Sequence, residues 1–248
     1  MSGVAVVTGG AQGLGWGIGT CLRDDGWRVV AVDLVAGETE AGDTGIAFRP
    51  MDVCDREQVA ATLAAVVEEH GSLDLLVNNA GITRHRPLVD LTWEDWSAVV
   101  DVNLHGAFNC LQAAGRLMLE QGGGVIVNIA SVAAERGAGG RAPYATTKAA
   151  LVGLTRSAAV EWASHGIRVN AVGPGYVDAG VLRAAIETGT LDPADVLERI
   201  PAGRLAEPAE IGAMVSFLAS PRAAYVTGQV LYVDGGFLAD YGVHVKKR

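Results

Sequence analysis

Short apolar runs alternate with longer amphipathic stretches along almost the whole chain, and this alternation constrains the fold more than any other feature. Several runs are apolar at successive positions, as in Val125-Ile126-Val127, which is typical of strands buried on both faces. Parallel sheets covered by helices bury their strands in this way. Seven runs are predicted as strands: Val4–Thr8, Arg28–Asp33, Ile46–Met51, Leu73–Asn78, Gly124–Ala130, Ile167–Val172 and Gln229–Val233.

The intervening stretches predict helices, which complete the pattern of an α/β protein. They lie at Gly13–Asp25, Arg56–His70, Trp93–Gln121, Tyr144–Ser164 and Pro208–Ala219. We therefore expect a doubly wound, Rossmann-type parallel sheet of about seven strands, with helices on both faces and right-handed crossovers. The 248 residues suit one domain, 1–248. A segment at about 178–207 has no predicted strand and only weak helical pieces, so it is predicted to form a substrate loop.

Charge and composition exclude several classes of function. The formal net charge is −9, and the basic block at 246–248 stands alone, so we expect no nucleic-acid or membrane partner. No apolar run is long enough to span a bilayer, and no secretory signal is predicted. Three widely spaced cysteines (Cys21, Cys54 and Cys110) are expected to be reduced, mostly buried thiols of a cytoplasmic protein. The five histidines are scattered, so no metal site is predicted.

A glycine-rich turn, Thr8-Gly9-Gly10-Ala11-Gln12-Gly13-Leu14-Gly15, follows the first predicted strand. Between a strand and a helix, such glycines let the backbone approach a pyrophosphate, and the helix N-terminus offers free N–H groups. The spacing G-x-x-x-G-x-G differs from the usual dinucleotide pattern, and a plain tight turn is the alternative. The position after the first strand favours a dinucleotide site that includes Gly9, Gln12, Gly13, Leu14 and Gly15.

Two acids end the next strands on the same predicted edge. Asp33 can accept hydrogen bonds from both ribose hydroxyls of an adenosine and would repel a 2′-phosphate, so we expect NAD(H) as cofactor rather than NADP(H). A helix cap or a solvated acid is the alternative for Asp33. Arg28 and Arg49 are the cations near this strand, and both are expected to lie too far away to bind such a phosphate. Asp52, followed by Val53, could reach the adenine amino group or could cap the next helix.

Tyr144 and Lys148 are four residues apart in a predicted helix, so their side chains share one face. A phenol has an ordinary pKa near 10, and a nearby ammonium favours its ionised form. Proton transfer to an alcohol or a carbonyl requires such an acid or base tuned toward neutral pH. Ser131 follows the Gly124–Ala130 strand at the edge where ligands bind in these sheets, and a turn cap is its alternative role.

With these residues in place, the chain resembles the short-chain dehydrogenase/reductase family over its whole length. The matching pieces, in this order, are Thr8–Gly15, Asp52, Asn78-Asn79-Ala80-Gly81, Asn103 within Val102-Asn103-Leu104-His105-Gly106, Ser131, Tyr144–Lys148, Pro174-Gly175 and Asp234-Gly235-Gly236. Each piece is common by itself, but the complete series at these spacings is highly specific.

The resemblance implies a role for each matching residue. Tyr144 would be the general acid/base, Lys148 would lower its pKa and hold the nicotinamide ribose, and Ser131 would orient the substrate oxygen. Asn103 would interrupt a helix and hold a proton-relaying water. The resemblance places the cofactor against Asp52, Val53, Asn79, Ala80, Gly81, Pro174, Gly175 and Val177, with Asn79 bracing the sheet. Where such families usually carry a Thr that binds the carboxamide, this chain has Ala179, so that bond is missing or is made by the backbone.

Substrate specificity is expected to come from loops at the same edge, namely Ile82–Arg86, Val132–Arg141, Tyr176–Val177 and Asp178–Glu207. In the last of these, Val181, Leu182 and Ile186 could cover a substrate or pack as an ordinary helix face. The run before Tyr144 differs from that of acyl-carrier-protein ketoreductases, which favours a sugar, polyol or other small secondary alcohol and its ketone. The basic group Arg84, His85 and Arg86 keeps a 3-oxoacyl-[acyl-carrier-protein] reductase as the alternative, because an acidic carrier needs such a surface.

Two further expectations concern assembly and activity. The family resemblance implies a homotetramer. The apolar residues of the two long helical stretches agree with that, since they exceed what one sheet face needs: Phe108, Leu111, Leu117, Met118, Leu151, Leu154 and Trp162. A non-catalytic nucleotide-binding regulator is a second class of function, but the presence of Tyr144, Lys148, Ser131 and Asn103 favours an enzyme.

Overall fold

The computed structural model of the protein describes residues 3–40, 44–187, 189 and 192–240. Seven strands form one parallel sheet in the order β3-β2-β1-β4-β5-β6-β7, which confirms the doubly wound topology. The strands are β1 (Val4–Thr8), β2 (Arg28–Asp33), β3 (Ile46–Pro50), β4 (Leu75–Asn78), β5 (Gly124–Ile129), β6 (Ile167–Pro174) and β7 (Val230–Val233). The strand order reverses between β1 and β4, and ligands bind at such a reversal in open α/β sheets.

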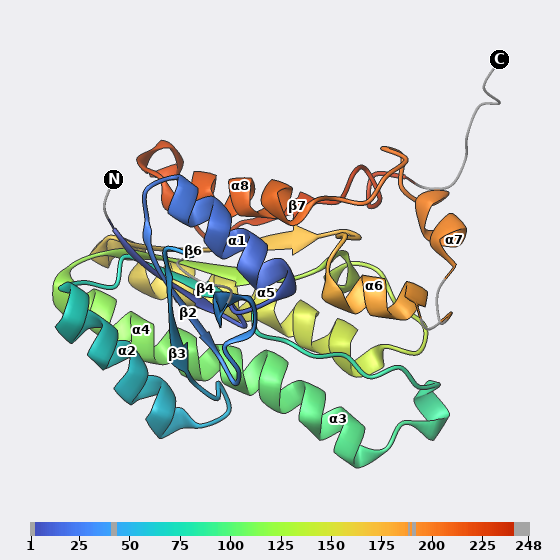
Figure 1. Ribbon diagram of the computed structural model, residues 1–248, viewed down its shortest axis with the longest axis horizontal. Helices are drawn as coiled ribbons and strands as arrows, with labels where there is room; N and C mark the ends of the chain where they lie inside the picture. Colours follow the sequence, from blue (N-terminus) through green and yellow to red (C-terminus); the bar gives the residue numbers. More distant parts are fainter. Residues whose placement is uncertain (1–2, 41–43, 188, 190–191, 241–248) are drawn as a thin grey trace.

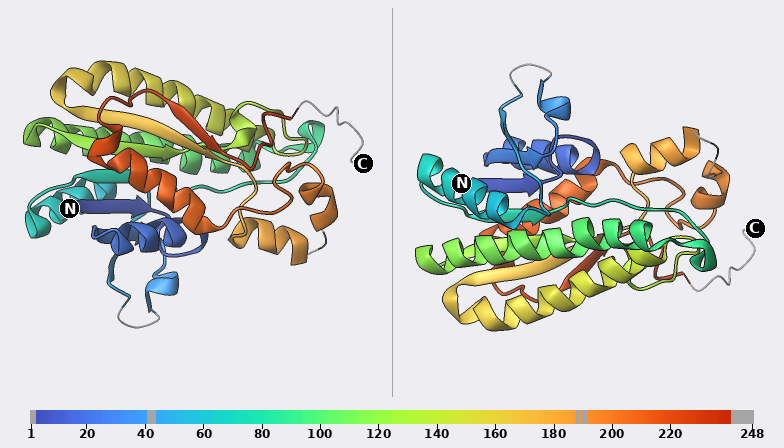
Figure 2. Two further views of the ribbon diagram at one scale, coloured as in Figure 1. Left: turned by 90° about the horizontal axis from the view of Figure 1, so that it is seen from above. Right: turned by 90° about the horizontal axis from the view of Figure 1, so that it is seen from below.

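Helices cover both faces of the sheet (Figures 1 and 2). They are α1 (Gly13–Asp24), α2 (Arg56–His70), α3 (Trp93–Val100), α4 (Ala107–Gln121), α5 (Ala142–Trp162), α6 (Gly180–Glu187), α7 (Pro193–Leu197) and α8 (Pro208–Ala219). Residues that alternate along each strand point to opposite faces: Val4 and Val6 pack toward α2, α4 and α5, whereas Ala5 and Val7 pack toward α1 and α8. Both faces are therefore buried, which explains why the strands are continuously apolar.

One predicted helix is interrupted. The periodicity of Trp93–Gln121 indicated a single helix, but the structure contains α3, a π-helical turn at Asp101–Gly106 and then α4. The buried Asn103 lies in this turn, so the structure confirms the interruption that the family resemblance implied. Turns of this kind often mark functional sites, because they re-aim side chains without ending the helix.

Figure 1 places α6 and α7 beyond the carboxyl ends of the strands, with the loops that follow β1, β4, β5 and β6 at the same edge. The weak helical pieces predicted between 178 and 207 are α6 and α7. In the part of the chain that the structure describes, no helix is long and apolar enough to cross a membrane.

Candidate active site

The glycine turn leads directly from β1 into α1. Gly9 and Gly13 have positive φ angles of 59° and 56°, which side chains rarely adopt. A Cβ on Gly15 would lie 2.0 Å from the carbonyl oxygen of Gly9, so the turn closes only with glycine there. The N–H of Gly13, at the start of α1, donates to Oε1 of Glu38 at 3.1 Å. This helix N-terminus therefore binds an anionic oxygen within the chain itself, as free N–H groups at helix starts do.

The carboxylate of Asp33 lies beside this turn. Its Oδ1 accepts from the N–H of Leu34 at 2.8 Å, and its Oδ2 accepts from the N–H of Ala11 at 3.4 Å. Arg28 begins β2, and five residues of strand place it about 17 Å from Asp33. Arg49 forms an ion pair with Glu69. Neither arginine offers a partner to a phosphate beside Asp33.

Asp52 and Val53 follow β3 toward the same edge. Oδ1 of Asp52 accepts from the N–H of Cys54 at 2.8 Å, which holds a tight turn. Asp55, not Asp52, caps α2, because its side chain accepts from the N–H groups of Glu57 and Gln58. The alternative that Asp52 caps this helix is therefore wrong. Val53 is buried, and its carbonyl accepts from Nδ2 of Asn109 at 3.0 Å.

Asn79 joins β4 to the glycine turn. Its Nδ2 donates to the carbonyl oxygens of Thr8 at 3.0 Å and Gly9 at 3.1 Å. The buried hydroxyl of Thr8 in turn accepts from the N–H groups of Asn79 and Ala80, both at 3.0 Å. These bonds cross the point where the strand order reverses, so they fix the turn relative to the residues that follow β4.

Ser131, Tyr144 and Lys148 come together where β5 ends against α5. The hydroxyls of Ser131 and Tyr144 share a hydrogen bond. Nζ of Lys148 lies 5.6 Å from the centroid of the Tyr144 ring and donates to the carbonyl oxygen of Ile129 at 2.6 Å. Ser131 also accepts from the N–H of Ala133, so it both caps a turn and faces the phenol.

The protonation of this group reflects its burial. Burial raises the pKa of Tyr144, and the hydrogen bond from Ser131 and then the positive charge of Arg141 oppose that rise. Burial lowers the pKa of Lys148 from 10.5 to about 8. A lysine with this pKa exchanges its proton near neutral pH, which an exposed lysine does not.

Asn103 connects the π-helical turn to this group. Its Oδ1 accepts from the N–H of Ile82 at 2.8 Å, and its Nδ2 donates to the Ile82 carbonyl at 3.0 Å and to Oγ1 of Thr147 at 3.3 Å. Thr147 directly precedes Lys148. The side-chain amide thus binds the loop after β4 and holds it against α5; Gly81 packs on the same amide, since a Cβ there would lie 3.3 Å from Oδ1.

The segment after β6 forms the other side of the edge. Gly175 packs against Asp234, and its N–H donates to the Val233 carbonyl at 3.0 Å. Val177 is buried and pairs with Ala206, which ties this segment to the chain leading into α8. The N–H of Ala179, where the family resemblance leads us to expect a threonine, donates to the Val177 carbonyl at 2.8 Å.

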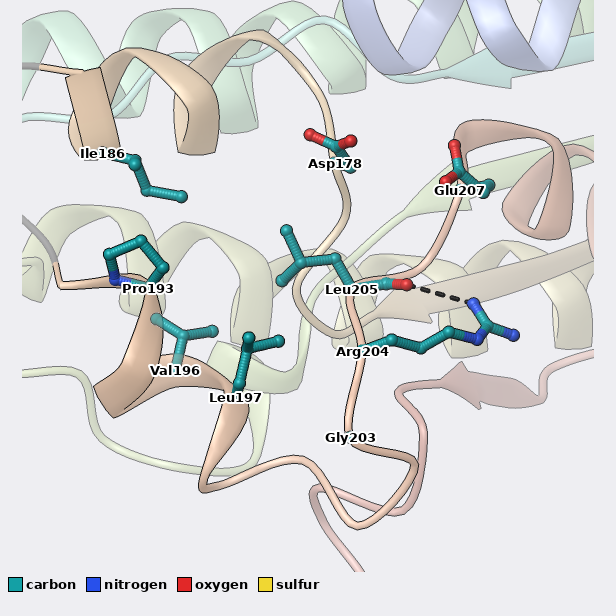
Figure 3. A pocket seen from close by; sticks show the side chains of 9 residues that line it. All are labelled: Asp178, Ile186, Pro193, Val196, Leu197, Gly203, Arg204, Leu205 and Glu207. Atoms are coloured by element: carbon teal, nitrogen blue, oxygen red, sulfur yellow. Dashed lines mark hydrogen bonds between the residues drawn. The ribbon is translucent and has the colours of Figure 1, made fainter.

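The predicted substrate segment encloses a cavity of about 330 Å³ between α6, α7 and the start of α8 (Figure 3). Ile186 and Leu205 point into it, and two bidentate ion pairs flank it, Arg183–Asp178 and Arg204–Glu210. Tyr144 does not line this cavity. Leu182 is half-buried, and the side chain of Val181 lies outside the described residues.

The thiols are poor nucleophiles. Burial raises the pKa of Cys110 to about 12 and that of Cys54 to about 11. Cys54 is exposed and Cys21 half-buried, so of the three thiols, all within the described residues, Cys110 alone is fully buried, contrary to the expectation that most are. Among the described ranges, no group of three or more His, Cys, Asp or Glu side chains could hold a metal ion.

The structure brings the sequence-predicted residues to one edge, with the glycine turn and Asp33 on one side and Ser131, Tyr144 and Lys148 on the other. Gln12 is the N-cap residue of α1, although its side chain makes no capping bond, and Leu14 packs against the core. Sequence analysis missed Glu38 and the effect of Arg141 on Tyr144. The available signal was the position of Arg141, at the end of the predicted loop Val132–Arg141 and three residues before Tyr144.

Comparisons with known proteins agree with this geometry. The family model described as Enoyl-(Acyl carrier protein) reductase matches residues 9–238. The 3-oxoacyl-[acyl-carrier-protein] reductase FabG of Staphylococcus aureus is 39% identical over 244 residues, which cover 95% of this chain and 98% of that protein. The solved structure of levodione reductase has a TM-score of 0.91 and 35% identity, and the match covers 96% of this chain and 98% of that one.

A second solved structure, ElxO with NADP bound, has a TM-score of 0.91 and 30% identity, and the match covers 97% of this chain and 100% of that one. The site geometry and this NADP-bound neighbour both agree with a nicotinamide cofactor. The family match, the identity over nearly the whole chain and the shared fold lead to one conclusion. The chain belongs to the short-chain dehydrogenase/reductase family and is an oxidoreductase that acts on CH–OH groups.

Proposed function

We propose that this enzyme interconverts a small secondary alcohol, such as a sugar or polyol, and its ketone with NAD(H), using Tyr144 as general acid/base. The observation that carries the proposal is the hydrogen bond between Tyr144 and Ser131 beside the buried Lys148. This arrangement places a transferable proton at the sheet edge that also holds the glycine turn and Asp33. The whole chain, 1–248, would act as one dinucleotide-binding and catalytic domain, with 178–207 as its substrate loop.

The residues of the chain divide the work of the reaction. Ser131 donates to the substrate oxygen and orients it toward Tyr144. During oxidation Tyr144 takes the hydroxyl proton as the carbinol carbon loses hydride, and during reduction it returns a proton to the developing alkoxide. The bound nicotinamide supplies the acceptor or donor of the hydride. Lys148 favours the ionised phenol and holds the nicotinamide ribose, while Asn103 keeps the loop after β4 in place and holds the proton-relaying water that the family resemblance implies.

The choice of NAD(H) rests on Asp33. Its carboxylate lies beside the glycine turn, where a 2′-phosphate would meet like charge, and Arg28 and Arg49 are distant or paired. ElxO binds NADP, so membership of the family does not decide the cofactor; the residue at this position does. The glycine turn, Asp52, Val53, Asn79, Ala80 and Gly81 would bind the adenosine half, and Pro174, Gly175 and Val177 the nicotinamide half.

A small substrate is favoured over an acyl carrier protein because Asp95 neutralises half of the arginine charge of the basic loop. Nε of Arg84 lies 3.4 Å from Oδ1 of Asp95, and Nε of Arg86 lies 2.6 Å from its Oδ2. Arg84, Arg86 and Asp95 together keep one net positive charge, so the loop offers an acidic partner less charge than its two arginines alone would. The second candidate is a 3-oxoacyl-[acyl-carrier-protein] reductase, which the 39% identity to FabG favours.

We expect a cytoplasmic homotetramer with no nucleic-acid or membrane partner. Part of the apolar surface assigned to this assembly is used inside the subunit, because Leu111, Met118 and Leu151 are buried in the core. Phe108 on α4 and Val160 on α5 are exposed, and a second subunit could cover them.

The test of the catalytic assignment is Tyr144→Phe. The ring still packs, but the transferable proton is gone, so kcat should fall at least ~10²-fold while NADH binding, followed by its fluorescence, stays. Tyr225→Phe, at an exposed tyrosine, is the matched control and should keep full activity. Turnover of Tyr144→Phe within a few-fold of wild type would sink the assignment.

A substrate panel decides between the two candidates. Sugars, polyols, cyclic alcohols and 3-oxoacyl thioesters should be tested with both nicotinamide cofactors. A kcat/KM for carrier-bound thioesters above that for every small ketone would replace the proposed function by the second candidate.

A further inference from the structure

Arg141 is a cationic side chain near Tyr144 that the proposed reaction does not use. Arg141 is the N-cap residue of α5, three positions before Tyr144, and its side chain is half-buried. Its guanidinium makes no hydrogen bond or ion pair with any residue in the ranges that the structure describes. Arginine remains charged at any physiological pH, so Arg141 brings a positive charge for which the described residues offer no acidic partner.

Two neighbouring groups locate this charge. The positive charge of Arg141 opposes the rise that burial causes in the pKa of Tyr144, and, after burial, it contributes to lowering the pKa of His85. The charge of Arg141 therefore acts on both side chains. Because the pKa of His85 is lowered, its imidazole is neutral at pH 7, and Arg141 supplies the charge.

The backbone fixes the two loops that carry these residues. The N–H of Arg86 donates to the carbonyl oxygen of Gly140 at 2.9 Å, and the N–H of Arg141 donates to that of Ala138 at 3.1 Å. The loop after β4 is thereby docked on the loop before α5. Arg84 and Arg86 share the carboxylate of Asp95, whereas Arg141 has no acidic partner among the residues that the structure describes.

We propose that Arg141 binds a carboxylate of the substrate, so that the preferred substrates are hydroxy acids and the matching oxo acids. The planar fork of an arginine fits a carboxylate through two parallel hydrogen bonds. Because Arg141 is the N-cap residue of α5, one turn before Tyr144, an acid group held by Arg141 would lie within a few carbons of a carbinol held by Tyr144. This inference rests on the proposed function and narrows its substrate class.

The experiment compares pairs of substrates that differ in charge alone. 3-Hydroxybutanoate and 3-hydroxybutanamide form one pair, and 4-hydroxypentanoate and its amide form a second pair with a longer spacer. In wild type, kcat/KM for the acid of at least one pair should exceed that for its amide roughly tenfold or more. Arg141→Gln should remove that preference mainly through KM of the acid, with the amide changed within about threefold, and Arg141→Lys should restore part of it.

Arg222→Gln is the matched control, because it also removes one arginine charge, in this case from an exposed side chain. Arg222 follows α8 near Leu218 and Ser220, whose carbonyls Arg168 binds at the amino end of β6, so it lies far from Tyr144. This variant should keep the wild-type preference. Because Arg141 also affects the pKa of Tyr144, Arg141→Gln should shift the pH profile of acid and amide alike, whereas the change in KM should concern the acid alone.

The outcomes separate the two proposals. Turnover of neutral alcohols with no preference for the acids, or a preference that survives in Arg141→Gln, overturns the carboxylate site and leaves the proposed function standing. If no secondary alcohol or ketone of either charge is turned over, the proposed function itself fails.

Discussion

Replacing Lys148 by methionine should make the cofactor-free protein more stable at pH 7 while it abolishes most activity. The side chain is buried, and burial lowers its pKa from 10.5 to about 8. Each pKa unit corresponds to about 1.4 kcal/mol, so keeping this ammonium charged at pH 7 costs roughly 3 kcal/mol. Methionine removes that cost but leaves the carbonyl of Ile129 unpaired, which costs about 1–3 kcal/mol. A net gain on the order of 1 kcal/mol is expected.

The pH dependence gives the sharper test. Between pH 8 and 10.5 the unfolded lysine holds a proton that the folded one has released, so the stability of wild type rises with pH relative to the variant. The difference in the free energy of unfolding between wild type and Lys148→Met should therefore change in favour of wild type by about 2 kcal/mol between pH 7 and 9.5. Urea unfolding of both proteins, without cofactor, measures this. The thiols are present in both proteins, so their effect cancels in the difference. Both proteins should carry Tyr144→Phe in this comparison, because Lys148 favours the ionised phenol and the titration of Tyr144 would otherwise differ between them. If this difference in the free energy of unfolding stays constant from pH 7 to 9.5, the lowered pKa of the buried Lys148 is refuted.

Three further expectations follow from the site and the fold. Wild type should prefer NAD(H) over NADP(H) roughly 30-fold or more in kcat/KM, since repulsion of the 2′-phosphate by Asp33 amounts to about 2 kcal/mol after solvent screening. Asp33→Ala should lose most of that preference. Equal use of both cofactors by wild type would contradict the role of Asp33. Gly17→Ala should lower the free energy of unfolding by about 1–3 kcal/mol, because its Cβ would lie 2.3 Å from Cβ of Pro208; thermal unfolding measures this, and an unchanged Tm would contradict the close packing of α1 on α8. Light scattering should give a tetramer at micromolar concentration, and a monomer would rule out the proposed assembly.

The sheet could be predicted from the sequence because both its faces are buried. Every predicted strand exists, although β4 starts at Leu75, two residues later than predicted, and β6 extends to Pro174, two residues further. Apolar periodicity could not reveal the π-helical turn around Asn103. One extra residue per turn hardly alters a helical pattern, and the turn depends on bonds from Asn103 to Ile82, 21 residues away.

The parts of the candidate site that could be predicted from the sequence are those in which a local pattern of residue types indicates the function directly. The glycines of the turn, and Tyr144 with Lys148 on one helix face, are of this kind. Arg141 was not, because its proximity to His85 depends on two loops meeting through the Arg86–Gly140 bond, and no local pattern encodes that contact. Likewise, the sequence could not show which of Asp52 and Asp55 caps α2, because an aspartate suits both the turn and the cap. The structure uses Asp52 for the turn and Asp55 for the cap.

The strand order has a consequence for how the molecule could be divided. Strands β1–β3 and strands β4–β7 are each contiguous in sequence and in space, so a single cut between α2 and β4 would separate the sheet into two blocks. Within the sheet, the β1–β4 pairing alone would rejoin them, helped by the bonds from Asn79 to Thr8 and Gly9. The block with Asp33 would carry the adenosine half of the site, and the block with Tyr144 the reacting half. This enzyme is thus suited to fragment complementation, with recovered activity reporting that the two pieces have met.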